Sequence, residues 1–188
     1  MGEWKKKREV MLHYDQTGGG YDAQYAEEQN AKMEATVSNI ILIKNSIVLD
    51  MGCGTGLLFP YIADKTQFLI AIDISRKLLK QAKKRAKQHP NIALIQADAD
   101  HTPFKTQTFH AVFAITLLQN MPNPTATLEE IERITRPEAT ISLTTLKKKF
   151  TQQAITELLK KAKLKSTILK TSAKTKDHII ICQKADGS

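Results

Sequence analysis

The sequence has little of several features that would assign a protein to a special class. Its 188 residues include two cysteines, Cys53 and Cys182, far apart and in no C-x-x-C pair. We therefore expect neither a disulfide framework nor a metal site, and a reducing cytoplasm as the location. No apolar run approaches the length of a membrane span, and the lysine-rich start has no apolar segment of the signal-peptide kind. These absences predict a globular protein that is not inserted in a membrane.

Aromatic residues are also few, whereas positive charge is abundant. Phe, Tyr and Trp make up 6% of the chain, and the formal net charge is +9. An excess of this size favours anionic partners, RNA among them. Lysine-rich faces are, however, commonly no more than solvated surface. The shortage of aromatic side chains for stacking on bases also counts against RNA.

The most informative stretch is 46–56, which reads S-I-V-L-D-M-G-C-G-T-G. Its apolar run is typical of a strand buried on both faces, and a helix-like pattern follows the glycines. A strand, a glycine turn and a helix in this order form the nucleotide-binding corner of a doubly wound α/β fold. Glycine is needed because the ligand must lie against bare backbone. The three glycines stand at alternate positions: Gly52, Gly54 and Gly56.

The spacing of these glycines, together with the acid before them, indicates the ligand. A dinucleotide fingerprint would need a third glycine where this chain has Leu57, and the Gly-Lys-Ser/Thr of a P-loop is absent. Asp50 closes the strand two residues before the first glycine. A carboxylate in that place would repel a pyrophosphate but attract an ammonium group. The predicted ligand is therefore a nucleoside with a cationic amino-acid tail, and a nicotinamide dehydrogenase is disfavoured.

The run L-D-M-G-C-G-T-G at 49–56 resembles motif I of the class I S-adenosylmethionine (SAM) methyltransferases, in particular the small single-domain type 11 group. The resemblance covers the chain from residue 46 onward. It implies an α/β fold with a doubly wound, mostly parallel seven-stranded sheet and an antiparallel last strand. We expect a single domain, in which residues 1–45 form a flap and helices over the cofactor site and residues 46–188 form the SAM-binding core.

Apolar periodicity divides the chain into alternating elements. The predicted strands after the first are 68–72, 92–97, 109–118, 139–146, 164–171 and 178–183, and the predicted helices are 23–43, 56–65, 75–88, 124–135 and 151–163. Residues 1–12 are expected to be a short amphipathic helix or a basic tail. Three successive glycines predict a turn-rich segment at 13–22. A further turn is expected at 136–138.

The resemblance implies a role for each acid that follows a strand. Asp73 lies about 20 residues after the first glycine, at what we expect to be an open strand tip, and would accept hydrogen bonds from both ribose hydroxyls. Asp98 would accept a hydrogen bond from the adenine amino group, and Asp100 is the less favoured candidate for this role. Ser75 is the expected N-cap of the next helix. The predicted cofactor-binding set is Asp50, Gly52, Cys53, Gly54, Gly56, Asp73, Ile74, Asp98, Ala99, Thr116, Tyr21 and Tyr25.

The two tyrosines in this set belong to a pattern Y-D…Y-D…Y that resembles the flap of small methyltransferases. Tyr21 and Tyr25 would then cover SAM, and the alternative is that they only anchor a helix to the core. Methyl transfer from SAM needs mainly positioning and desolvation, so a dedicated base is optional. His13 is the candidate base near the flap, although a lone histidine in a turn is more often structural. Gln119 and Asn120 are candidates to orient the acceptor.

The acceptor is the part that the sequence constrains least. Parallel strands bring Lys147, Lys148 and Lys149 to the same edge of the sheet as the acids, near the basic residues 5–8. Two basic clusters at one mouth favour a phosphate-bearing acceptor, so we predict RNA or a component of the translation machinery. A small-molecule methyltransferase and a catalytically silent SAM-fold subunit are the alternatives. A small activator or partner subunit is a further candidate partner.

Overall fold

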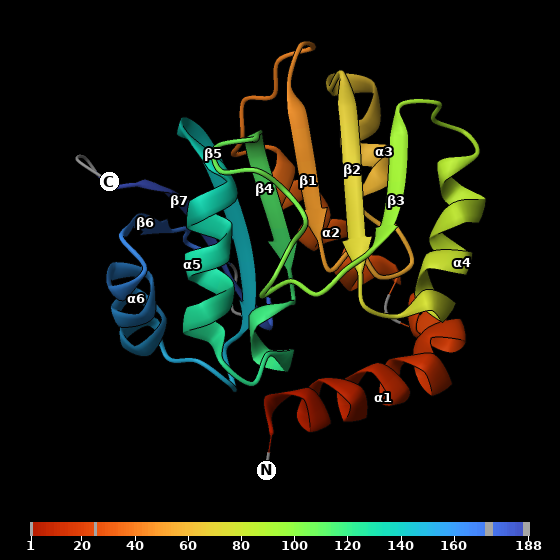
Figure 1. Ribbon diagram of the computed structural model, residues 1–188, viewed down its shortest axis with the longest axis horizontal. Helices are drawn as coiled ribbons and strands as arrows, with labels where there is room; N and C mark the ends of the chain where they lie inside the picture. Colours follow the sequence, from red (N-terminus) through yellow and green to blue (C-terminus); the bar gives the residue numbers. More distant parts are fainter. Residues whose placement is uncertain (1, 25, 172–174, 186–188) are drawn as a thin grey trace.

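The structure is a computed structural model that describes residues 2–24, 26–171 and 175–185, with the backbone alone between residues 17 and 28. Its centre is one seven-stranded sheet with the order β3-β2-β1-β4-β5-β7-β6 (Figure 1). The strand β7 pairs antiparallel with both of its neighbours, and all other neighbouring strands are parallel. This confirms the predicted sheet and its antiparallel last strand. The strands are β1 (Ile47–Met51), β2 (Phe68–Asp73), β3 (Ile92–Gln96), β4 (Phe109–Ile115), β5 (Thr135–Leu146), β6 (Leu164–Ile168) and β7 (Asp177–Lys184).

Helices cover both faces of the sheet, which is why its central strands are apolar on both sides. One face carries α5 and α6, which pack through residues such as Leu128 and Leu159, and the other carries α2, α3 and α4, which include Met33 and Phe59. No helix among the described residues is both long and apolar enough to cross a membrane. The bounds are α1 (Glu3–Gln24), α2 (Ala26–Val37), α3 (Phe59–Ile62), η1 (Ala63–Lys65), α4 (Arg76–Ala86), η2 (Leu118–Asn120), α5 (Pro124–Ile134) and α6 (Gln152–Lys161).

The first helix, α1, belongs to neither layer and crosses the carboxyl ends of the strands (Figure 1). Its side chains reach the loops after three different strands: Lys7 contacts Asp98 after β3, and Asp15 accepts a hydrogen bond from Ser75 after β2. Tyr14 accepts one from Asn120 after β4. The prediction of a turn-rich segment at 13–22 is therefore wrong, because α1 continues through the three glycines. Each glycine costs a helix about 1 kcal/mol relative to alanine, which contacts along the rest of the helix can offset.

Several boundaries also differ from those predicted: the helix expected at 23–43 ends at Val37, and the strands expected to reach residues 118 and 171 end at Ile115 and Ile168. Two further differences have a clear physical reason. Residues 136–138 were expected to form a turn, but they lie within β5, where Phe109 pairs with Thr135 and Ala111 already pairs with Thr140. The extra residues of β5 form a bulge in the strand rather than a turn before it. The helix predicted at 56–65 is shortened to α3 and η1, since Gly56 has a left-handed φ of 82° that no helix can include.

Candidate active site

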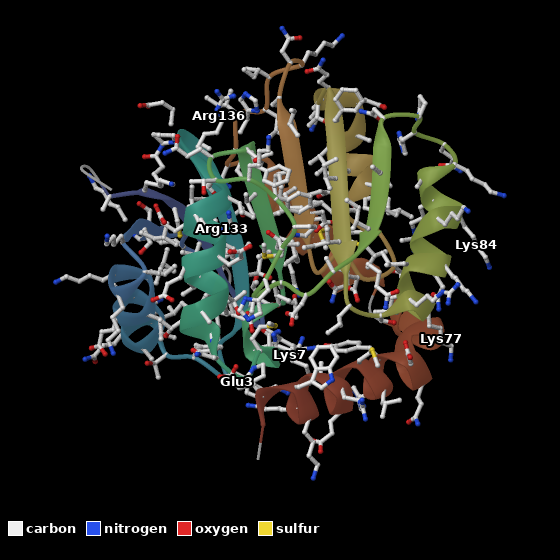
Figure 2. All side chains as sticks on the ribbon, viewed as in Figure 1. Glu3, Lys7, Lys77, Lys84, Arg133 and Arg136 are labelled. Carbon is white, nitrogen blue, oxygen red and sulfur yellow. The ribbon has the colours of Figure 1, made fainter. Side chains whose placement is uncertain are left out.

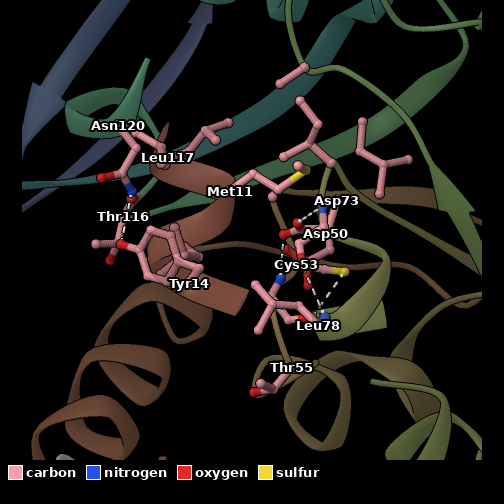
Figure 3. Close-up of a pocket in the computed structure, with 18 of the residues that line it drawn as sticks. Met11, Tyr14, Asp50, Cys53, Thr55, Asp73, Leu78, Thr116, Leu117 and Asn120 are labelled. Atoms are coloured by element: carbon pink, nitrogen blue, oxygen red, sulfur yellow. Dashed lines mark hydrogen bonds between the residues drawn. The ribbon is translucent and has the colours of Figure 1, made fainter. Parts of the chain in front are cut away.

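A pocket opens at the carboxyl edge of the sheet, between the ends of β1, β2, β3 and β4 and the two N-terminal helices. Figure 3 shows its two ends: Asp50, Cys53 and Asp73 lie on one side, and Tyr14 and Asn120 lie on the other. The described residues that line it are Lys7, Val10, Met11, Tyr14, Gln29, Met33, Asp50, Gly52, Cys53, Gly54, Thr55, Leu57, Leu58, Ile72, Asp73, Ile74, Ser75, Leu78, Ala97, Asp98, Ala99, Ile115, Thr116, Leu117, Asn120 and Met121.

The glycine turn after β1 forms one wall of the pocket and is held by backbone hydrogen bonds. The amides of Gly52 and Cys53 both donate to the carbonyl of Ile72, each over 2.9 Å, which fixes the turn against the end of β2. Gly54 has a φ of 55°, and a Cβ added to it would meet no atom within 4 Å. Its backbone is therefore bare and faces open space, as close approach of a ligand requires. A Cβ at Gly56 would instead lie 2.4 Å from the ring of Phe59.

Asp50 lies at the floor of the pocket and is almost fully buried, with 2% of its surface exposed. Its Oδ2 atom has no hydrogen-bond partner among the described residues. Burial, with a smaller contribution from the charge of Asp73, raises the pKa of Asp50 to about 8. A buried carboxyl group with a raised pKa is stabilised in its ionised form by a cation placed beside it. The site therefore presents a buried carboxyl group that lacks a positive partner and that a bound cation would hold in its ionised form.

Asp73 ends β2 and joins three segments of the site. Its Oδ2 accepts a hydrogen bond of 2.9 Å from the amide of Gly54, and its Oδ1 accepts one of 2.8 Å from the amide of Ser75. Burial raises the pKa of Asp73 above its ordinary value, and these two amide bonds oppose that shift. Only 9% of the residue is exposed, so the expectation of an open strand tip is wrong. Asp73 positions the glycine turn and the start of α4 while it lines the pocket.

The loop after β3 carries two acids that share one lysine. The Nζ atom of Lys7 lies 2.7 Å from both carboxylate oxygens of Asp98 and 2.6 Å from Oδ2 of Asp100. Burial of the ammonium group lowers the pKa of Lys7, but the hydrogen bonds to Asp100 and Asp98 outweigh it and hold the pKa above its ordinary value. Thr127 of α5 donates to the other oxygen of Asp100. This end of the pocket is therefore closed by an ion pair that links α1 to β3.

The opposite end of the pocket is formed at the end of β4. Asn120 donates through Nδ2 to the hydroxyl oxygen of Tyr14 over 3.1 Å and to the carbonyl of Thr116 over 3.0 Å. The hydroxyl of Thr116 lies 3.3 Å from Nζ of Lys32, which forms a buried ion pair of 2.7 Å with Asp177. This end therefore combines a tyrosine hydroxyl and an amide with a buried ion pair directly behind them.

A family model described as a methyltransferase domain, Methyltransf_11, matches residues 49–143, half of the chain. The chain belongs to this methyltransferase family. The match begins at the last residues of β1, so it includes the glycine turn and the acids after β2 and β3. The fold is accordingly that of the class I SAM-dependent methyltransferases, whose cofactor is SAM.

This methyltransferase is similar to two curated relatives and to one solved structure. It is 27% identical over 142 residues to a malonyl-[acyl-carrier protein] O-methyltransferase of Marinomonas sp. (strain MWYL1), covering 74% of this chain and 52% of that protein. It is 29% identical over 143 residues to a demethylmenaquinone methyltransferase of Corynebacterium urealyticum, covering 74% and 60%. The complex of DhpI with SAH has the same fold, with a TM-score of 0.78 at 16% identity and coverage of 96% and 97%. The chain thus spans only part of the length of the two curated relatives.

Most of the residues predicted for the methyltransferase site do come together in this pocket. The exceptions among the described residues are Gly56, His13, Gln119 and the lysines 147–149, which do not line it. His13 is exposed, with its ring 5.6 Å from that of Tyr14, and the three lysines are exposed in the turn after β5. The side chain of Tyr21 and the whole of Tyr25 lie outside the described residues, so the predicted aromatic cover stays a prediction.

Sequence reasoning placed residues 1–45 over the cofactor site but did not identify the residues of α1 that line the methyltransferase pocket. Four of its residues line the pocket: Lys7, Val10, Met11 and Tyr14. Their spacing of three and four residues is the signature of one helical face, so the signal was present in the sequence. It was obscured because the basic run 5–8 appears uniformly charged and solvated, whereas only Lys7 in that run is buried.

Proposed function

We propose that this methyltransferase transfers the methyl group of SAM to a small-molecule acceptor, which enters the pocket between α1 and the end of β4. The observation that carries the proposal is the separation of the pocket into two ends. Three acids and the bare backbone of Gly54 occupy the end at β1 to β3, whereas the described lining residues at the end of β4 carry no charge and are Ile115, Thr116, Leu117, Asn120 and Met121. Small-molecule sites have this second composition, in which a few polar groups orient a largely apolar ligand.

The residues present fit SAM at the first end. Asp50 offers a buried carboxylate oxygen without a partner, as the ammonium group of SAM requires, and Gly54 offers bare backbone beside open space. We assign the ribose hydroxyls to Asp73, which lines the pocket and whose carboxylate has about four lone-pair positions for the amides of Gly54, Ser75 and Ile74 and for a ligand. We assign the adenine amino group to Asp98, and the adenine ring to the apolar surface of Ile74 and Ala99. When bound there, SAM supplies the activated methyl group.

The second end would hold and orient the acceptor. Leu117 and Met121, which follow β4, provide apolar surface that excludes water from the site. The hydroxyl oxygen of Tyr14 already accepts from Asn120, which leaves its own proton free to donate to an acceptor oxygen. Positioning of this kind, with desolvation, can supply most of the catalysis that a reactive methyl donor needs. The thiol of Cys53 stays neutral there, because burial raises its pKa well above the ordinary value.

Two observations favour a small molecule over RNA. The lysines 147–149, which motivated the RNA hypothesis, are absent from the described lining of the pocket. The relatives described above are named for malonyl-[acyl-carrier protein] and demethylmenaquinone, not for a nucleic acid. Because the chain covers only 52% and 60% of these two relatives, the acceptor is to be identified by a transfer experiment.

Transfer of labelled methyl groups tests the proposal. The protein would be incubated with methyl-labelled SAM and a cell extract divided into small molecules with lipids, protein, and RNA. We expect label in the small-molecule and lipid fraction, and its absence when Asp50→Asn replaces the wild type. Label that stays with RNA and disappears after ribonuclease treatment would favour the RNA alternative. SAM binding without transfer to any fraction would favour the catalytically silent subunit.

A further inference from the structure

One cation in the pocket has no role in the function proposed above. Lys7 is 93% buried, since 7% of it is exposed, and it points from α1 toward the sheet (Figure 2). Its ammonium group is shared by both oxygens of Asp98 and by Asp100, at 2.6 to 2.7 Å. Neighbouring basic residues of the same helix, Lys5 and Lys6, are exposed. The helix is therefore oriented so that one lysine out of several is placed in the pocket.

The carboxylate that holds Lys7 is the one assigned to the adenine amino group. A carboxylate has about four lone-pair positions. Lys7 is within hydrogen-bond distance of both oxygens of Asp98, and Oδ1 also accepts from the amide of Asp100 over 3.1 Å. An amino group and an ammonium group would both be donors aimed at the same oxygens. Side by side, they would compete for the same acceptor.

Among its described side chains, residues 3–16, the helix that carries Lys7 is attached to the pocket largely through polar contacts. Asp15 accepts from Ser75, Lys77 donates to the carbonyl of Asp15, and Tyr14 accepts from Asn120. Its apolar pocket residues Val10 and Met11 are only partly buried. An element with few buried apolar contacts and several exchangeable polar ones opens at a lower free-energy cost than the core does. Local separation of α1 is thus compatible with an intact sheet.

We propose that Lys7 is an internal competitor for the adenine subsite, which must leave Asp98 before a ligand that carries adenine can bind. The inference rests on the proposed function, and specifically on the assignment of Asp98 to the adenine amino group. In this arrangement the pocket exists in a closed form, with Lys7 on Asp98, and an open form that binds SAM. The apparent affinity is the intrinsic affinity reduced by the fraction of open molecules. Removing the lysine side chain's charge would then strengthen binding, although it removes a contact of the folded protein.

Calorimetric titration of Lys7→Met tests the competition, with Lys6→Met as the matched control from the same helix. If about a tenth of the wild-type molecules are open, Lys7→Met should bind SAM about tenfold more tightly. It should bind the demethylated product, SAH, more tightly by the same factor, because both ligands carry adenine. Weaker or unchanged binding overturns the proposal. So does a gain for SAM alone, which would indicate repulsion of its sulfonium charge instead of competition.

A second substitution separates this proposal from the assignment on which it rests. In the Lys7→Met background, Asp98→Asn should weaken SAM binding by about tenfold, since one charge-assisted acceptor is lost. If it has no effect, Asp98 is not the adenine acceptor and the assignment fails. If it weakens binding while Lys7→Met alone gives no gain, the assignment stands and the competition is refuted.

The wild-type protein provides a test that needs no variant. Trp4 is the single tryptophan of the chain, it lies one helical turn before Lys7, and it is 57% exposed. Its fluorescence therefore reports on α1 during rapid mixing with SAM. We expect the observed rate to reach a plateau at high SAM concentration, because opening of α1 becomes rate-limiting. The proposal that Lys7 must withdraw before SAM binds would be contradicted by an observed rate that rises linearly with SAM concentration throughout. It would also be contradicted by a fluorescence that does not change on binding.

Discussion

The glycine turn and the two N-terminal helices form opposite sides of one pocket, but they are held in place by different interactions. The turn at 50–56 follows a buried apolar strand and is fixed by backbone hydrogen bonds to its neighbour β2. Among the described side chains, α1 is fixed largely by polar pairs such as Lys7 with Asp98, whereas α2 adds to its ion pair of Lys32 with Asp177 the packing of Met33 and Val37 in the core. Backbone bonds leave the turn little freedom to move, whereas ion pairs can be exchanged for a ligand. One side is therefore suited to be a rigid template and the other a movable cover.

The largest effect that would test this difference is expected at Lys32, which attaches α2 to the sheet. The ion pair with Asp177 is buried, with 3% and 0% of the two side chains exposed. Lys32→Met should lower the free energy of unfolding by about 3–5 kcal/mol, since it leaves a buried carboxylate without its cation. The exposed Lys44→Met is the control and should change stability by less than about 0.5 kcal/mol. Urea unfolding measures both.

A double substitution shows whether the ion pair itself or the loss of one partner matters. Lys32→Met with Asp177→Leu should recover most of the lost stability, because an apolar pair of similar volume can replace a buried ion pair at little cost. If the double variant is as unstable as Lys32→Met, the pair is not the attachment of α2 that we infer.

Smaller effects are expected in the glycine turn, where one glycine should be needed mainly for stability and another mainly for SAM binding. Gly56→Ala should cost about 1–3 kcal/mol of stability, because its Cβ meets the ring of Phe59 at a left-handed φ. Gly54→Ala should cost only about 1 kcal/mol, since its Cβ meets no protein atom. It should nevertheless weaken SAM binding by about tenfold or more, because the Cβ projects where the ligand must lie. If the two variants lost the same stability and the same SAM affinity, this division of roles would be refuted.

The smallest effect concerns the pH dependence of stability at Asp50. Its pKa is about 8 in the folded protein and about 4 in an unfolded chain. The folded state thus binds the proton more tightly, so the stabilisation is complete below pH 4 and is lost as the pH rises toward 8. Between pH 6 and 7 the cofactor-free protein should lose about 1 kcal/mol through this group. Asp50→Asn should remove that loss, and unfolding curves of both proteins that fall in parallel with pH would contradict it.

The core was largely predictable from the sequence, because its signals are local. A continuous apolar run followed by an acid and spaced glycines defines β1 and the turn, and Ser75 caps α4 through a hydrogen bond from Leu78, as expected. The remaining strands were predicted within a few residues, because each is an apolar run between polar loops. The acids Asp50, Asp73 and Asp98 were placed at one edge of the sheet by topology alone, and they line one pocket.

The N-terminal cover was much less predictable, because its contacts join residues far apart in the chain. Lys7 and Asp98 are 91 positions apart, and Lys32 and Thr116 are 84 apart. A lysine carries no local sign that distinguishes a buried ion pair from a solvated surface position. The three glycines in α1 also suggested a turn, since helix propensity cannot take account of tertiary contacts elsewhere in the helix. The double role of Asp73, as ligand group and as link between Gly54 and Ser75, required the folded geometry.

The most direct test of the central claim is a calorimetric titration of the wild-type protein with SAM, SAH and NAD. The account holds that the buried carboxylate of Asp50 beside the glycine turn selects a nucleoside with a cationic tail and rejects a pyrophosphate. It predicts that SAM and SAH bind and that NAD does not. Binding of NAD as tight as that of SAM, or no binding of SAM at all, would contradict it.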